Sequence, residues 1–195
     1  ENLNLEKIIG KIKESISHYV KLMAEGSNIV DEGHEKYAPV PLLSTFVKDS
    51  LEKGKDITSG GARYNFSGVQ GIGLPNLCDS LMIIKKFIFD NKKYTYKELM
   101  EALRNNFEGK YSIIREEFVN DETKYGNDID EVDNISADIL RYYCKEVEKY
   151  SNPRGGKFIP GSYTVSAHIP LGEVVGATPD GRYSGEQLAD GGLSP

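Results

Sequence analysis

The sequence predicts an α/β fold that is mostly helical and contains a few short strands. Apolar residues recur at helical spacing through most of the first two-thirds of the 195-residue chain. Two strand-like stretches, 57–73 and 163–170, interrupt this pattern on either side of a helical block. Helices that alternate with such pieces are typical of α/β architectures, although two pieces do not by themselves close a sheet.

The first two helices follow from apolar spacing and from their end signals. Leu5, Ile8, Ile12 and Ile16 begin a stripe that we expect to end near Gly26. A second helix is expected over 41–53, since proline suits the first turn of a helix and Gly54 can end one.

Four further helices are expected before the chain becomes irregular again. The first starts near Asn76, which can cap it, and runs to Phe89. Thr95 and Glu98 form a capping box for the next. The helix that the capping box opens is expected to run over 95–107, and the third helix over 111–120. The fourth is a long helix that follows the acidic run 127–133 and is broken by N-P-R-G-G at 152–156.

The glycine-rich stretch 57–73 suits tight turns, close backbone approach and one short strand, because glycine is too dense there for a helix. Its G-V-Q-G-I-G segment superficially resembles a dinucleotide-binding loop. The order of the glycines is wrong for that fingerprint, and Pro75 removes an amide donor. Backbone packing is therefore the better interpretation of these glycines.

Residues 163–170, Y-T-V-S-A-H-I-P, form the strongest predicted strand, since they are β-branched and aromatic and are bounded by Gly161 and Pro170. Alternation would place Tyr163 on one face and Ser166 and His168, with Thr164, on the other. A polar face of this kind either lines a cavity or belongs to an edge strand that faces water. The pattern leaves both interpretations open.

Composition excludes several classes of partner. The net charge is −6 and no basic patch is present, so we expect no nucleic-acid partner. The longest mainly apolar run, 81–89, is interrupted by two lysines and is far shorter than the roughly 20 residues that span a bilayer, so we expect no membrane partner. Two cysteines make neither a disulfide framework nor a zinc site, and the absence of a signal-like N-terminus favours a cytoplasmic location.

The sequence shows no group of residues that would form a metal site or an activated nucleophile. The three histidines are isolated, and the aspartates of 121–133 lack a calcium-loop pattern. Cys144 and Glu146 lie two apart on a predicted helix and point about 200° away from each other. We therefore interpret Cys144, and also Cys78, as packing residues.

Six groups of motifs, taken in order, resemble the glycyl radical enzymes, the family of pyruvate formate-lyase and its dehydratase and lyase relatives. They are G-G-A-R-Y-N with V-Q-G-I-G (60–73), C-D-S-L (78–81), K-Y-G-N-D (124–128), N-P-R-G-G (152–156), P-G-S-Y-T-V-S-A-H (160–168), and A-T-P-D-G-R with L-A-D-G-G-L-S-P (177–195). The similarity extends over essentially the whole chain, and it is the order of the motifs that makes it specific.

The resemblance implies a ten-stranded α/β barrel made of two five-stranded halves and wrapped in helices. In that family one loop carries a radical cysteine, often in G-C-x-E, and another carries a glycine, often in R-V-x-G-Y. An activating enzyme that uses S-adenosylmethionine and an iron–sulfur cluster installs the glycyl radical. Neither motif occurs in residues 1–195, so no catalytic or metal-binding residue is carried over and this segment is expected to bind no cofactor.

By the same resemblance, residues 1–195 are the C-terminal part of the barrel domain, without the cysteine loop and the glycine radical domain. The segment would supply barrel wall and part of the pocket for a small-molecule substrate, with Tyr163, Ser166 and His168 as substrate-binding residues. The ending L-A-D-G-G-L-S-P resembles the dehydratase and lyase branch, and Pro195 suggests a cut within a longer enzyme.

Two alternatives remain open at this stage: a stand-alone binding protein without chemistry, and one half of a split enzyme. In either of the enzyme readings the isolated segment is expected to be inactive. Barrel surfaces that lack their partners lead us to expect a homo-oligomer.

Overall fold

The computed structural model describes residues 3–163 and 165–190, which form two units. One unit combines the residues up to Lys11 with 70–140 and the stretch from Ser162 onward. The other combines Ile12–Val69 with Arg141–Gly161. Thr164 of the predicted strand and the end of the L-A-D-G-G-L-S-P motif lie outside the described residues.

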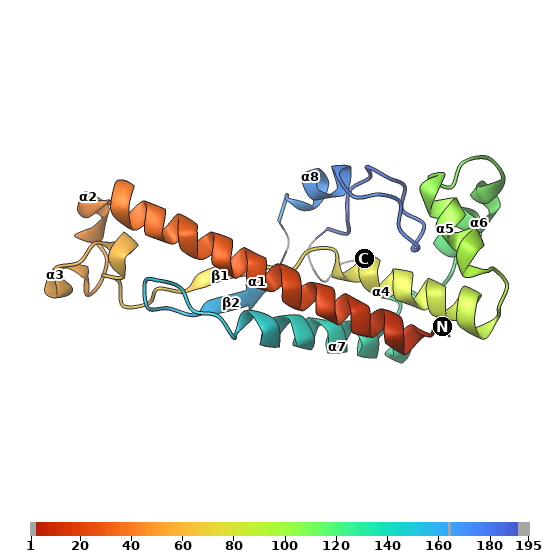
Figure 1. Cartoon of the computed structure of the whole chain (residues 1–195), viewed down its shortest axis with the longest axis horizontal. Helices are drawn as coiled ribbons and strands as arrows, with labels where there is room; N and C mark the ends of the chain where they lie inside the picture. Colours follow the sequence, from red (N-terminus) through yellow and green to blue (C-terminus); the bar gives the residue numbers. More distant parts are fainter. Residues whose placement is uncertain (1–2, 164, 191–195) are drawn as a thin grey trace. The chain divides into compact units, whose positions relative to one another are not determined.

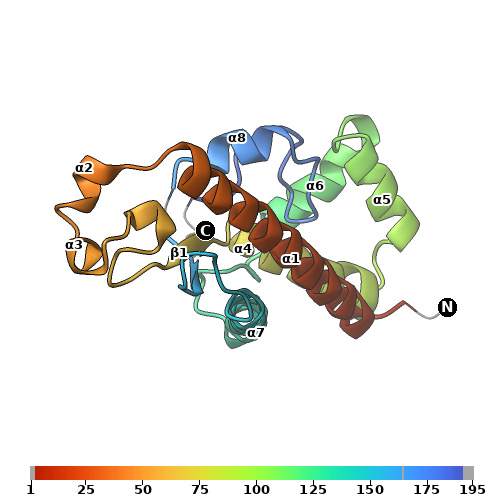
Figure 2. The same cartoon turned by 60° about the vertical axis from the view of Figure 1, so that its left-hand side comes forward.

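Helices form most of the described chain, and Figures 1 and 2 show them in two views. The α-helices are α1 (Leu5–Tyr37), α2 (Pro41–Ser44), α3 (Ser50–Lys53), α4 (Leu74–Ile83), α5 (Tyr96–Arg104), α6 (Ser112–Val119), α7 (Asp130–Val147) and α8 (His168–Glu173). The 3₁₀ turns are η1 (Ile57–Ser59) and η3 (Gly109–Tyr111), and a π-helical segment, η2 (Ile84–Asp90), continues α4. The strands are β1 (Ser67–Gln70) and β2 (Phe158–Gly161).

The predicted end of the first helix at Gly26 is wrong, because α1 continues through Gly26 and Gly33 to Tyr37. A Cβ added at either glycine would meet no neighbouring atom, so neither glycine is needed for close packing. Each costs an exposed helix only about 1 kcal/mol relative to alanine. The helix ends just before Pro39, since a proline disfavours helical geometry in the residue that precedes it.

The single helix predicted over 41–53 is also wrong, since two one-turn helices, α2 and α3, occupy this stretch. Between them Asp49 adopts a left-handed φ of 74°. Its carboxylate accepts two hydrogen bonds from the Arg63 guanidinium, both of 2.8 Å, so a distant side chain stabilises the break. The predicted proline start and the Gly54 stop are confirmed, with Gly54 in the left-handed region.

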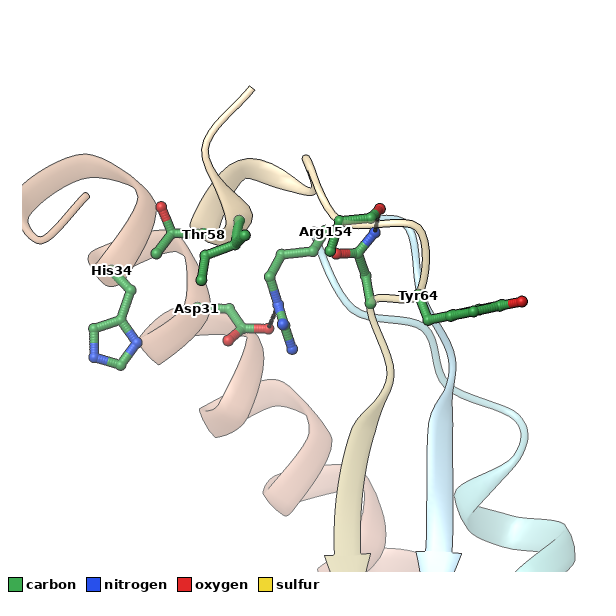
Figure 3. A pocket seen from close by; sticks show the side chains of 8 residues that line it. Asp31, His34, Thr58, Tyr64 and Arg154 are labelled. Atoms are coloured by element: carbon green, nitrogen blue, oxygen red, sulfur yellow. Dashed lines mark hydrogen bonds and ion pairs between the residues drawn. The ribbon is translucent and has the colours of Figure 1, made fainter. Parts of the chain in front are cut away.

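The glycine-rich stretch 57–73 does place backbones against each other, as predicted, and it contains the short strand β1. A Cβ on Gly60 would lie 2.6 Å from the carbonyl oxygen of Arg154, and one on Gly156 would overlap the carbonyl of Asn65. The side-chain amide of buried Asn152 donates to Ser67 Oγ at 2.9 Å. The motifs at 60–65 and 152–156 are thereby joined where the two parallel strands begin (Figure 3).

The predicted strand at 163–170 is wrong. The strand in this region is β2, which ends at Gly161, and His168 begins α8. Pro170 lies in the first turn of that helix, where its missing N–H leaves no bond unmade. The alternation that placed Tyr163 opposite Ser166 and His168 therefore does not describe this segment.

The unit that contains β2 and all of β1 except Gln70 has a small core of its own. Its buried residues come from α1, α7 and β2, and they are Val20, Ala24, Val147 and Phe158. Ser17 Oγ and the Tyr142 hydroxyl, 2.7 Å apart, add a polar contact between the two helices inside this unit.

An aromatic cluster forms the core of the other unit, where η2, α5 and α6 lie side by side. Phe118 is fully buried, with its ring 5.2 Å from that of Phe87 and 6.3 Å from that of Phe107. The predicted capping box opens α5: Thr95 N donates to Glu98 Oε2 at 2.7 Å, and Glu98 N donates to Thr95 Oγ1 at 3.2 Å. The predictions for α6 and α7 are confirmed to within a few residues.

The helix at 74–83 begins without the predicted Asn76 cap, since Gly73 precedes it and no side chain caps it. Asn76 instead joins two distant loop residues. Its Nδ2 donates to Asp180 Oδ2 at 2.7 Å, and its Oδ1 accepts from Ala189 N at 2.7 Å. Ser80, one turn further along α4, accepts from the backbone N of Asp180 at 3.2 Å.

Buried Arg182 holds the same loop from the inside. Its Nη1 donates to the carbonyl of Glu186 at 2.6 Å, and its Nη2 donates to the carbonyls of Val175 at 3.1 Å and of Gly176. Thr178 Oγ1 accepts from its Nε at 3.2 Å. Four residues of one loop are thus gathered around a single guanidinium, which fixes the path of the chain after α8 (Figure 1, blue).

Replacing Phe118 by alanine should reduce the free energy of unfolding by about 3–5 kcal/mol, because the change leaves a cavity among aromatic rings. Ile113→Ala, on the exposed side of the same helix, is the control and should change it by less than about 0.5 kcal/mol. Urea unfolding of the 195-residue chain measures both. Equal effects of the two substitutions would show that the cluster is not the core of this unit.

Asp79 should make stability depend on pH. Burial raises the pKa of its carboxyl to about 6, even though the backbone N–H of Tyr125 donates to it at 2.8 Å. The unfolded value is about 3.9, so this contribution to stability is full below that pH and is lost as pH rises through 6. Asp79→Asn removes the loss. The free energy of unfolding of the variant minus that of the wild type should therefore be about 1 kcal/mol larger at pH 8 than at pH 5. Urea unfolding at the two pH values measures this difference.

Candidate functional site

The three residues predicted to bind substrate all follow the carboxyl end of β2, but they differ in exposure. Tyr163 is 62% exposed, Ser166 is exposed, and His168 is 8% exposed. No hydrogen bond connects the three among the described residues. In parallel α/β folds, binding residues gather beyond the carboxyl ends of the strands, so their place along the chain suits the predicted role.

His168 is the best-defined member of this group. Its Nδ1 lies 2.8 Å from the carbonyl oxygen of Val165 and 3.6 Å from Oδ1 of Asp190. Its own carbonyl accepts from Leu188 N at 3.2 Å. The loop residues Leu188 and Asp190 therefore help to fix the position of this histidine within its unit.

Asn76, Asp180 and Arg182 hold the loop that packs against α8 and His168. The sequence did not indicate this supporting role. A Cβ on Gly172 would lie 2.6 Å from Gln187 Cα, so α8 packs directly against the loop that they hold. The only sequence signal was T-P-D-G-R, in which Asp180 and Arg182 lie on either side of Gly181. That signal does not reveal that both charges are buried.

A cavity of about 310 Å³ lies in the other unit, at the ends where β1 and β2 begin (Figure 3). Arg154 crosses it and donates from Nε to Asp31 Oδ2 at 3.0 Å and from Nη2 to Ser67 Oγ at 3.0 Å. The remaining lining residues are His34, Ile57, Thr58, Ala62, Tyr64 and Asn65. Because Asp31 neutralises the arginine, the cavity offers no unpaired cation to an anionic ligand.

The cavity and the predicted substrate residues are separate features. None of Tyr163, Ser166 and His168 lines it. It borders the amino ends of the strands, whereas those three residues follow a carboxyl end. In barrel folds the amino ends of strands mainly serve stability, so we interpret the Asp31–Arg154 pair as structural.

The environments of the two cysteines do not favour a thiolate. Burial raises the pKa of the Cys78 thiol to about 11. Burial also raises the pKa of Cys144, which lies within α7 as predicted. In the part of the chain that the structure describes, no three His, Cys, Asp or Glu side chains are arranged to hold a metal ion. No helix there is long and apolar enough to cross a bilayer.

The pyruvate formate lyase-like family matches residues 1–172 of this chain. The chain is 37% identical over 190 residues to trans-4-hydroxy-L-proline dehydratase of Clostridioides difficile, and 33% identical over 190 residues to (2S)-3-sulfopropanediol dehydratase of Klebsiella oxytoca. These alignments cover 97% and 96% of the chain but 24% and 23% of the two relatives.

Solved structures give the same result. A B12-independent glycerol dehydratase from Clostridium butyricum, with glycerol bound, matches with a TM-score of 0.90 and 44% identity, over 97% of this chain and 24% of that one. A structure from work on 1,2-propanediol dehydration in Roseburia inulinivorans matches with a TM-score of 0.92 and 38% identity, over 97% of this chain and 25% of that one.

The neighbours confirm the predicted fold class, an α/β segment of a glycyl radical enzyme barrel. The chain spans about a quarter of the length of the relatives it matches. The family match over residues 1–172, together with these identities and structural similarities, shows that the chain belongs to the pyruvate formate lyase-like family of glycyl radical enzymes.

Proposed function

We propose that the enzyme that contains this segment is a radical dehydratase, which removes water from a small hydroxylated substrate. The pattern of identities supports this most directly. Relatives and structures described as dehydratases lie between 33% and 44% identity over nearly the whole chain, whereas the decarboxylases lie at 29–32%. An isethionate sulfite-lyase is 37% identical over 131 residues, so cleavage of a carbon–sulfur bond is the competing activity.

Within that enzyme, the segment would supply barrel wall and one side of the substrate pocket. Tyr163, Ser166 and His168 are the proposed substrate-binding residues. Their position after the carboxyl end of β2 supports this role, as does the support that the loop around Arg182 gives to α8.

The radical chemistry is proposed to lie in parts of the enzyme outside residues 1–195. The family implies a protein glycyl radical, installed by an activating enzyme that uses S-adenosylmethionine and an iron–sulfur cluster. The cysteines of this chain do not fit a radical relay, because Cys78 is buried and Cys144 lies within a helix, in the last turn of α7. No reaction step is assigned to them, and the isolated segment should be inactive.

We also propose a cytoplasmic location and a homo-oligomeric state. Two free cysteines suit a reducing compartment. Large apolar side chains lie exposed around α2 and α3, among them Phe46 at 80% and Leu42 at 75%. Surfaces of this kind mark contacts with other protein.

The dehydratase proposal is tested on the full reading frame that includes these residues. The protein is activated anaerobically with its activating enzyme and S-adenosylmethionine, and the radical is measured by electron paramagnetic resonance. Glycerol, 1,2-propanediol, trans-4-hydroxy-L-proline and isethionate are then supplied.

Dehydration of one of the first three compounds is expected. The Tyr163→Phe and Ser166→Ala variants should each raise KM for that compound by about tenfold, because each loses one hydrogen bond. Ile113→Ala is the control. Turnover of isethionate alone would contradict the proposal.

Light scattering tests self-association. The 195-residue chain should give a mass above the 21.7 kDa of one copy, because its exposed apolar side chains lower their free energy by pairing. Replacing Leu42 and Phe46 by serine should shift the mass toward the monomer, whereas Glu52→Gln on the neighbouring α3 should not. A wild-type monomer at high concentration would contradict the prediction.

A further inference from the structure

The hydrogen bond of the His168 ring determines which of its nitrogens carries the proton. Nδ1 lies 2.8 Å from the carbonyl oxygen of Val165. A carbonyl oxygen can only accept a hydrogen bond, so Nδ1 must donate. Oδ1 of Asp190, 3.6 Å away, is too distant for a hydrogen bond, but its negative charge lies on the same side of the ring. The neutral ring is therefore the Nδ1–H tautomer.

In that tautomer Nε2 is a hydrogen-bond acceptor with an available lone pair. Nε2 has no hydrogen-bond partner within residues 3–163 and 165–190. The side chain as a whole is nearly buried.

The backbone around the ring is held in place as well. Leu188 N donates to the carbonyl of His168 at 3.2 Å, and Leu171 N donates to the carbonyl of Ala167 at 3.0 Å. The loop that makes the first of these contacts is itself tied to α4 through Ala189 and Asn76. An acceptor held this firmly is preorganised for a ligand that donates a hydrogen bond.

We propose that His168 binds substrate through Nε2 and accepts a hydrogen bond from a substrate hydroxyl group. This inference rests on the proposed dehydratase function, whose substrates carry hydroxyl groups. The proposal specifies Nε2 of His168 as the acceptor and the substrate hydroxyl group as the donor. Val165 and Asp190 act on the ring alone, so Asp190 is at most a positioning residue.

Two substitutions separate the binding role of His168 from a structural one. Asparagine places its amide near the position of Nδ1, so His168→Asn can keep the bond to Val165 but has no acceptor at Nε2. Glutamine reaches the position of Nε2 and offers an oxygen there, so His168→Gln keeps an acceptor for the substrate. In the activated full-length enzyme, the asparagine variant should raise KM for the hydroxylated substrate by about tenfold to a hundredfold, and the glutamine variant by much less. Ile113→Ala is the control and should stay within about twofold of the wild type, since Ile113 lies exposed on α6 and has no proposed part in binding.

A second measurement does not depend on activity. The chain has three histidines, so nitrogen NMR of the 195-residue protein can identify the His168 signals by their loss in the asparagine variant. The Nδ1–H tautomer is expected, and the Nε2–H tautomer would overturn the inference. An asparagine variant as active as the glutamine variant, in an active wild-type background, would overturn this inference alone. A wild-type enzyme that forms its radical but dehydrates no hydroxylated substrate would overturn the proposed function, and this inference with it.

Discussion

The contacts of one loop with the first turns of α4 are the constraint on which the site-bearing unit depends. Asp180 is buried and bound by Asn76 and Ser80, and Arg182 donates to the carbonyls of its own loop. Buried charges of this kind are tolerated only when they are fully hydrogen-bonded. Once they are, they exclude other conformations of the loop. The described residues between β2 and α8 have no regular structure, and they acquire a defined path because the loop packs on α8.

The two ends of the short sheet have different chemistry. Where the strands begin, glycines allow close contact between backbones, and Arg154 donates a hydrogen bond to Asp31 within a cavity, so the two charges neutralise each other. Beyond the end of β2 lie a tyrosine, a serine and a histidine whose Nε2 has no protein partner in the described residues. A self-neutralised pair stabilises the fold, whereas an unsatisfied acceptor is available to a ligand. This contrast supports placing substrate binding after the carboxyl end of β2.

Local signals succeeded where the physics is local. The capping box at Thr95, the left-handed stop at Gly54 and the long amphipathic α7 depend on residues a few positions apart, and all are found. The errors have distant causes. Gly26 does not end α1, because glycine only weakens a helix and Pro39 supplies the real end. Arg63 stabilises the break at Asp49, and Asn76 bonds to Asp180 and Ala189 instead of capping α4. The strand assigned to 163–170 failed because α8 and its packing against the 186–187 backbone outweigh β propensity.

By itself the sequence determined the family, the mostly helical α/β class and the stretch in which substrate residues were to be sought, because ordered motifs and apolar periods are properties of the chain. The tertiary structure decided which side chains are buried and which atoms stay unpaired. The structure shows that Arg182 of T-P-D-G-R is buried and holds its own loop. It also shows that His168 lies in a helix, where the contact of its Nδ1 with Val165 defines the tautomer of the neutral ring. Both results depend on contacts between residues that are loop neighbours only after folding, and no spacing rule records such contacts.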